Sequence, residues 1–504
     1  MGEALEQLRD RLGEIADLMA ASEMVLWDQQ IYMPRGGGPA HTIQLARLEL
    51  LIQQEYSSDD LGSLLEGAGR EVAGHPLDSD EASLVRVAKR EYDRRRRIPP
   101  KWSGEFARVL SVSRQVWERA RDTSDFELFR PHLERVVAMI REYANFFAPY
   151  DSPYDPVLDN FEPGLKTAKL LEIYATLRPA LRELLGRIQA HAEVVPDPPQ
   201  GDFNEREQWN LGIEVLHRMG FDFERGRQDC SAHPFTTALS PSDVRITTQI
   251  HRDLLTSALL STIHEGGHGL YEQGVDPGLA RTPLAGGAST AMHESQSRLW
   301  ENMVGRSRSF WRYFLPALKF HFPQLEALSA EGFYRAMNRV TPSCLRTEAD
   351  EVTYQLHVIL RFELERGLLD GSLAVKDLPG AWNEGMRQDL GVLPPNDAQG
   401  VLQDGHWSSG DFGYFPCYTV GDLISVQIFN EALAQEPQIS NEIESGNFLP
   451  LLSWLRENIY KHGAKFEAEE LVRRVTGLPI QVQPYLRYLQ SKFGDIYGFA
   501  APTA

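Results

Sequence analysis

Features that mark several other classes of protein are scarce in this sequence. Only three cysteines occur in 504 residues, Cys230, Cys344 and Cys417, and none belongs to a C-x-x-C pair. Such a sparse set argues against a disulfide framework. No apolar run is long enough to span a membrane. The beginning, MGEALEQLRDRLGEIADLMAA, is charged and typical of a helix, not of a secretory signal. We therefore expect a soluble cytoplasmic protein.

Positive charge is also in short supply. Lys and Arg number 51 against 71 Asp and Glu, which gives a net charge of −20. A surface of this sign repels nucleic acids and anionic membranes, so neither is expected as a partner. The one basic run, at residues 94–97, is interpreted as a solvated helix end.

Strand signals are thin, and repeats are missing. Stretches such as LLEIYATLRPALRELLGRIQAHAEVV place apolar residues three and four apart, which predicts helix after helix. DVRITTQI, residues 243–250, is the best strand. We expect a mainly α fold, one large unit over residues 1–504, with a small sheet near the functional site. Residues 1–56, broken by MPRGGGP, predict a helical hairpin that serves as a lid.

The short stretch STIHEGGHGLYEQG contains the zinc-peptidase signature His-Glu-x-x-His. On a helix, His264 and His268 lie one turn and about 40° apart, so both imidazoles face one ion. Glu265 sits to one side of that direction, where it can take a proton from activated water. The opposite side of the helix is apolar, as expected for a helix packed from behind.

A catalytic zinc site needs a third protein ligand. Glu272 is excluded because it lies about 12 Å along the helix from His264. Glu294, in GASTAMHESQSRLWENM, is the first choice, because it shares a helix face with small and polar residues. Glu301 is the alternative, unless it is an ordinary surface glutamate. His293 is either a partner of a metal ligand or a histidine with no role there.

The two central glycines of the motif disfavour a helix, at a cost of up to about 1 kcal/mol each. Gly266 points into the apolar back, where a missing side chain lets another helix approach. Gly267 lies on the flank away from Glu265. There we expect room for substrate or for the element that carries Glu294.

Together with five further motifs, HEGGH and HESQS resemble the M32 family of metallocarboxypeptidases, the carboxypeptidase Taq type. The further motifs are HPF, DVRIT, LRTEAD, GVLQDGHW and the early WDQQIYMP. LRTEAD departs from the family pattern only in having Leu345 for Ile. The resemblance implies a helical fold with a deep groove, like that of neurolysin and angiotensin-converting enzyme. It implies a carboxypeptidase that needs a divalent metal and is often a homodimer. It also assigns His264, His268 and Glu294 as ligands and Glu265 as general base.

Two groups of residues fit the remaining needs of such a reaction. QDGHWSSGDFGYFPCYTVGD offers a His and two Tyr, similar to the angiotensin-converting-enzyme site. We expect His406 and Tyr418 at the oxyanion and Tyr414 nearer the substrate terminus, with core packing as the alternative for both tyrosines. The expected substrates are peptides with a free C-terminal carboxylate, which arginine binds best.

Arg346 is the first choice for the carboxylate and Arg245 the second, and Gln403 is expected to bind the peptide backbone. An ion pair with Asp350 or Asp243, respectively, is the competing interpretation for each arginine.

Nitrogen and carboxylate ligands accept several ions. We expect one Zn²⁺ per subunit, with Co²⁺ or Mn²⁺ as alternatives. Two other functions stay open. An endo-acting oligopeptidase of the neurolysin type would share the metal site without needing a carboxylate clamp. A non-catalytic metal-binding protein is disfavoured because a structural site does not need Glu265.

Overall fold

The computed structural model describes residues 2–499, which form two compact units, each built from three separate stretches of chain. Unit 1 takes in residues 2–96, 198–337 and 424–479, and unit 2 takes in residues 97–197, 338–423 and 480–499. Helices dominate both units, and a small sheet lies in unit 1. The mainly α fold with a small sheet is therefore confirmed. The assignment of residues 1–504 to one domain stays a prediction.

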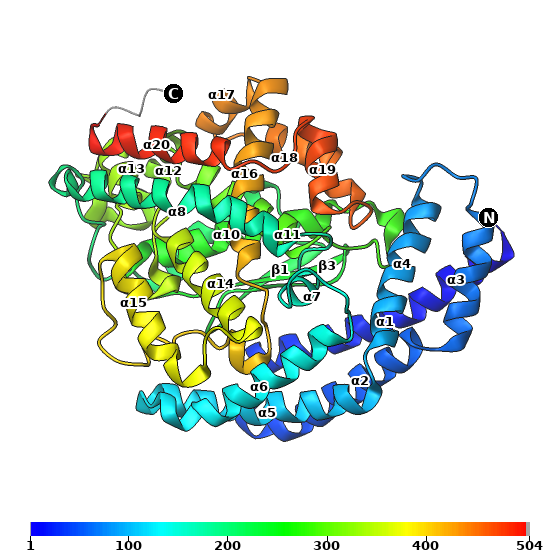
Figure 1. The fold of residues 1–504 in the computed structure, drawn as a ribbon. Coiled ribbons are helices and arrows are strands. Elements are labelled where there is room, and N and C mark those ends of the chain that lie inside the picture. Colours follow the sequence, from blue (N-terminus) through cyan, green and yellow to red (C-terminus); the bar gives the residue numbers. More distant parts are fainter. Residues whose placement is uncertain (1, 500–504) are drawn as a thin grey trace. The chain divides into compact units, whose positions relative to one another are not determined.

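Unit 1 holds an N-terminal group of helices, the sheet, and the helices that carry the histidine motif (Figure 1). Its helices are α1 (Glu3–Ile31), α2 (Gly38–Tyr56), α3 (Asp59–Glu71), α4 (Asp80–Arg97), α9 (Glu205–Met219), α10 (Leu255–Gly274), α11 (Thr290–Arg298), the π-helix η4 (Leu299–Gly305), α12 (Arg308–His321), α13 (Ala330–Met337), α17 (Ile439–Glu444), α18 (Leu449–Asn458) and α19 (Ala468–Thr476).

The N-terminal helices α1 and α2 pair as the predicted hairpin, and MPRGGGP supplies the break between them. Leu5, Leu8, Leu12 and Ile15 recur at helical spacing along α1, and all four are buried in one core with residues of α3 and α4. Burying this stripe of α1 is what holds the hairpin to the rest of unit 1.

The sheet has the order β1-β3-β2, with β1 (Gly226–Cys230), β2 (Thr236–Ser240) and β3 (Asp243–Thr248). The central strand β3 runs parallel to β1 and antiparallel to β2, and it falls inside the predicted stretch 243–250. Val244 and Ile246 alternate along β3 and are fully buried. Both β2 and β3 contact α10, so the small sheet lies at the histidine motif as predicted.

Unit 2 is helical, and α5 and α6 run beside each other as a hairpin (Figure 1). Its helices are α5 (Pro100–Thr123), α6 (Phe126–Asn145), α7 (Asp155–Leu158), α8 (Thr167–Gln189), α14 (Tyr354–Asp370), α15 (Leu378–Leu390), the short 3-10 helices η6 (Arg346–Glu348) and η8 (His406–Ser409), and α20 (Gln483–Tyr497). The helix α16 (Pro416–Gln435) begins in unit 2 and ends in unit 1.

All three cysteines are free thiols. No helix within residues 2–499 has the length and apolar character needed to cross a bilayer.

Candidate metal centre and other side-chain clusters

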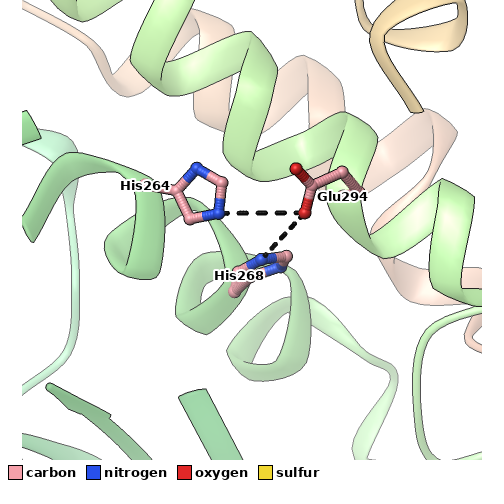
Figure 2. A group of neighbouring side chains, drawn as sticks. All are labelled: His264, His268 and Glu294. Atoms are coloured by element: carbon pink, nitrogen blue, oxygen red, sulfur yellow. Dashed lines mark ion pairs between the residues drawn. The ribbon is translucent and has the colours of Figure 1, made fainter. Parts of the chain in front are cut away.

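The centre is built on α10 and α11, two helices of unit 1 that contact each other. His264 and His268 lie one turn apart on α10, with ring centroids 4.9 Å apart. Their Nε2 atoms lie 3.8 and 3.6 Å from Oε2 of Glu294 on α11 (Figure 2). The structure thus brings together the three side chains expected as ligands.

Their spacing suits a single ion. One ligand atom from each residue lies within 4.8 Å of the other two. Bonds of about 2.0–2.2 Å to a tetrahedral ion would place its ligand atoms roughly 3.4 Å apart, close to the two distances to Glu294. Two imidazole nitrogens and one carboxylate oxygen are a donor set that fits a divalent metal.

Glu294 is held in its ionised form. Burial alone would raise its pKa, but Arg298, His264 and His268 together hold it well below the usual range. The Arg298 guanidinium donates to Oε1 of Glu294 over 2.7 Å, which leaves Oε2 facing the histidines. Burial lowers the pKa of His268 to about 3, so that ring is neutral, as a metal ligand requires.

Glu301 was expected either as an alternative metal ligand or as a surface glutamate, and the structure places it behind His264. It is buried, and its Oε2 lies 2.9 Å from Nδ1 of His264, the ring nitrogen that does not face Glu294. Arg306 and Arg298 also contact its carboxylate. The interpretation of Glu301 as a surface glutamate is therefore wrong. It contacts a predicted ligand from behind.

His293 also contacts a predicted ligand. Its Nδ1 lies 2.5 Å from Nδ1 of His268, and its Nε2 lies 2.7 Å from Oε1 of Glu272. Of the two alternatives for His293, the structure supports a partner of a metal ligand. Glu272, excluded as a ligand by distance, is the far end of this chain of contacts.

Glu265 is buried beside the two histidines and is oriented by the sheet. Thr236, the first residue of β2, donates through Oγ1 to Oε2 of Glu265 over 2.7 Å. Burial raises the pKa of Glu265, while His264 and this hydrogen bond oppose the rise. A raised pKa makes the carboxylate a stronger proton acceptor, which suits a general base. Sequence reasoning missed Thr236, although it directly follows HPF.

Each of the two motif glycines lies where another helix packs closely against α10. A Cβ built on Gly266 would lie 2.6 Å from Cδ2 of Leu216, on α9. A Cβ built on Gly267 would lie 2.7 Å from Cα of Ser297 and 3.0 Å from the Gln296 carbonyl oxygen, both on α11. Both expectations are confirmed: Gly266 admits another helix, and Gly267 admits the element that carries Glu294.

A second cluster of charged residues lies in unit 2. Asp404 accepts from Arg346 over 2.8 Å and from Nε of Arg361 over 2.7 Å, and both guanidinium groups are buried. Burial opposes ionisation of Asp404, but the two arginines hold its pKa well below the usual range. Two positive side chains thus share one carboxylate.

The expected partner Asp350 does not pair with Arg346. Asp350 accepts instead from Thr353 and from the backbone of Val352 and Thr341. The helical spacing does not apply because η6 is a short 3-10 turn that ends at Glu348.

Gln403 belongs to the same cluster. Its Oε1 accepts from the backbone N–H of Arg346 and from Arg361, and its Nε2 donates to the Cys344 carbonyl. These bonds tie residues 403–404 to the segment around Arg346. A contact between Gln403 and a peptide stays a prediction.

His406, Tyr414 and Tyr418 are brought together in unit 2. Ring centroids of Tyr414 lie 5.4 Å from those of both His406 and Tyr418. Burial, helped by Arg346 and Arg361, lowers the pKa of His406 to about 4, so the ring is neutral near pH 7. A neutral imidazole still offers one N–H donor. The roles of the three side chains in a reaction stay predictions.

Arg245, on β3, is already paired within unit 1. Its guanidinium bonds Asp243 through two contacts of 2.9 Å and lies 4.5 Å from the ring centroid of Trp27 on α1. The competing interpretation, an ion pair with Asp243, is therefore confirmed as a contact, and a role at the substrate carboxylate stays a prediction.

Comparison with known proteins decides the family. Residues 7–493 match the family described as carboxypeptidase Taq (M32) metallopeptidase. The chain belongs to the M32 family. It is a metallocarboxypeptidase, a peptide hydrolase.

The chain is similar to individual M32 relatives along nearly its whole length. The chain is 40% identical to thermostable carboxypeptidase 1 of Thermus thermophilus, over 98% of this chain and 99% of the relative. A crystal structure of an M32 carboxypeptidase from Deinococcus radiodurans R1 superposes with a TM-score of 0.93 at 38% identity, over 99% of this chain and 100% of that one. A Pyrococcus furiosus carboxypeptidase structure gives a TM-score of 0.94 at 33% identity, over 98% and 99%. The helical fold is that of M32 carboxypeptidases.

M32 membership implies a divalent metal. Among the described residues, His264, His268 and Glu294 offer such an ion a site.

Sequence reasoning missed two residues of the charged cluster around Arg346. Asp404 lies inside the GVLQDGHW motif and directly precedes Gly405-His406-Trp407, yet only its neighbours were assigned roles. Arg361 lies outside the motifs, in the apolar-looking stretch LHVILRFELERGLLDGSL, and no sequence signal marked it.

Proposed function

We propose that this enzyme removes C-terminal amino acids from peptides with one divalent ion bound by His264, His268 and Glu294. Zinc is our first choice of metal, and Co²⁺ or Mn²⁺ would suit the same donors. The observation that carries the proposal is the convergence of three ligand atoms beside a buried carboxylate, Glu265. A structural site would not need that carboxylate.

Glu265 acts as the general base in this proposal. When bound, the ion acidifies a water molecule and polarises the scissile carbonyl. Glu265 takes the proton from the attacking water and passes it to the leaving amine. The hydrogen bond from Thr236 holds Oε2 of Glu265 in one orientation, so the carboxylate does not have to be reoriented for each transfer.

We assign His406 and Tyr418 to the oxyanion that forms when water attacks, with Tyr414 nearer the substrate terminus. Both assigned groups are hydrogen-bond donors of the kind that stabilise such an intermediate. The neutral state of His406 supports the assignment, because its N–H donor does not depend on protonation near pH 7.

Arg346 is the first choice for the terminal carboxylate of the peptide. The cluster around it supports this choice, since Arg346 and Arg361 together carry one more positive charge than Asp404 neutralises. That excess attracts an anion in a buried setting. Arg245 is the second choice, and Gln403 is assigned to the peptide backbone.

The deciding experiment follows a synthetic peptide by time-resolved mass spectrometry, with and without a chelator. We expect stepwise loss of C-terminal residues, no cleavage after chelation, and recovery on adding Zn²⁺, Co²⁺ or Mn²⁺. A matched peptide amidated at its C-terminus should be cut far more slowly. Internal cleavage of both peptides at equal rates would instead show an endo-acting oligopeptidase.

Glu265→Gln tests the base separately. We expect this variant to retain the metal, measured by atomic emission after desalting, and to lose at least about 100-fold in kcat. Retained activity would contradict the assigned base while leaving the carboxypeptidase reaction intact.

We further propose that residues 1–504 work as one catalytic domain in a cytoplasmic homodimer, with the α1–α2 hairpin as a lid. The dimer rests on the family resemblance, and light scattering coupled to size-exclusion chromatography measures it directly.

A further inference from the structure

We propose that Glu272 and His293 form a relay that fixes the tautomer and ring orientation of His268, so that its Nε2 faces the metal. Both are positioning residues, which act through His268 and not on the substrate. The inference rests on the proposed function, because it assumes that His268 binds an ion. It assigns a purpose to Glu272, which ligand spacing alone had excluded.

The order of donors follows from chemistry. A carboxylate only accepts hydrogen bonds, so Nε2 of His293 donates to Glu272 across the 2.7 Å contact. The contact between the two Nδ1 atoms needs one donor and one acceptor, and in the relay Nδ1 of His293 accepts from Nδ1–H of His268. The proton of His268 is thereby held on Nδ1. Its Nε2, which faces Glu294, is left with the lone pair that a metal requires.

The packing holds His293 in place for this task. A Cβ built on Gly287 would lie 2.7 Å from Cδ2 of His293, so a side chain there would displace the ring. The ring centroid of Tyr271 lies 5.2 Å from that of His293. Gly267 lets the α11 backbone approach α10, which brings His293 against His268. Gly287 and Gly267 thus make room for His293 beside His268.

The two predicted histidine ligands are supported differently. His264 contacts the carboxylate of Glu301 directly, whereas His268 reaches Glu272 only through an intervening imidazole. Glu272 follows His268 by one turn on the same helix, and His293 from α11 bridges the gap. We therefore expect the relay to be sensitive to the position of α11 and the Glu301 contact to be independent of Glu272.

The test measures metal binding, not turnover. Zn²⁺ affinity is obtained by competition with a chromophoric chelator, and the Co²⁺ protein is examined by its visible d–d spectrum. We expect Glu272→Ala and His293→Ala to weaken Zn²⁺ binding by about 10- to 100-fold and to alter the Co²⁺ bands. Glu272→Gln keeps an acceptor oxygen and should retain most of the affinity. Added imidazole should restore part of the affinity of His293→Ala.

Glu365→Ala is the matched control. Glu365 is another buried glutamate that accepts from an aromatic side chain, Tyr154, but it lies on α14 in unit 2. It should lower thermal stability without changing Zn²⁺ affinity. The relay is overturned if Glu272→Ala binds Zn²⁺ as tightly as the wild type with an unchanged Co²⁺ spectrum, or if Glu272→Gln is as impaired as Glu272→Ala. Failure of the wild-type protein to bind Zn²⁺ or Co²⁺ would instead refute the proposed metal centre.

Discussion

At the scale of single residues, Gly266 and Gly267 leave space for different kinds of neighbour: a side chain at Gly266 and a helix backbone at Gly267. The atom that crowds a Cβ at Gly266 is a terminal methyl of Leu216, which a rotamer change can move. The atoms that crowd a Cβ at Gly267 belong to the backbone of α11 and cannot yield without moving the helix. The position of Glu294 therefore depends on Gly267 more than on Gly266.

This difference predicts unequal effects of two matched substitutions on stability and metal binding. Gly266→Ala should change stability little, because improved helix propensity of up to about 1 kcal/mol offsets local repacking. Gly267→Ala should destabilise the protein by about 1–3 kcal/mol and weaken metal binding, since α11 must shift. Thermal denaturation of the chelator-treated proteins and Zn²⁺ competition provide the two measurements. Equal behaviour of the pair would contradict the role given to Gly267.

Residue spacing placed His264 and His268 together and made Glu294 the first choice for the third ligand, because each argument needed only one helix and its faces. The contacts of His293 and Glu272 were not predictable in this way. They depend on how closely the α11 backbone approaches α10 at Gly267, and on the space that Gly287 leaves for the His293 ring. The surface interpretation of Glu301 was wrong for a similar reason: Glu301 is buried against His264 of another helix, a contact that spacing along one helix does not show.

At the scale of elements, the end of α1 is fastened to the sheet by paired arginines. Arg227 and Arg245 are direct neighbours in register on β1 and β3, and their guanidinium groups lie 5.4 and 4.5 Å from the ring centroid of Trp27. Tyr32 adds a 2.7 Å hydrogen bond to Asp229. The α1–α2 hairpin is therefore attached at its turn as well as along its apolar stripe.

Removing the Trp27 side chain should loosen the turn between α1 and α2. Trp27→Ala deletes a buried side chain and both cation–π contacts, and we expect a loss of about 3–5 kcal/mol in stability. Limited proteolysis should then cut faster within MPRGGGP. Tyr32→Phe removes the hydrogen bond to Asp229 from a largely exposed ring and should raise the cleavage rate much less than Trp27→Ala does. A turn that stays protected in Trp27→Ala would show that the stripe alone holds it.

Element prediction succeeded where periodicity was strong. The hairpin and the strand at 243–250 follow from local patterns, whereas β1 and β2 are short and half polar, so neither alternates clearly. The competing interpretation, an ion pair between Arg346 and Asp350 at helical spacing, was wrong because a 3-10 turn replaces the helix there. Arg346 pairs instead with Asp404, which is distant in sequence, and no local pattern indicates such a contact.

At the scale of the whole molecule, metal binding should raise the free energy of unfolding. A ligand that binds only the folded state at 100 times its Kd adds about 2.7 kcal/mol. Zn²⁺ should therefore raise the Tm of the chelator-treated protein by roughly a few degrees. Glu294→Gln, which loses the charged ligand but little volume, should lose most of this shift. An identical shift in that variant would place the ion elsewhere.

The interleaving of the two units has a consequence for biosynthesis. Unit 1 needs residues up to Pro479, and unit 2 needs the stretch that starts at Ile480. A ribosome therefore releases α10 and α11, with every proposed metal ligand, long before either unit has all its parts. Neither unit matches a continuous gene fragment, so expressing one alone would require joining distant segments. Truncation after α16 would leave both units incomplete, and nascent chains must stay protected from aggregation until α20 emerges.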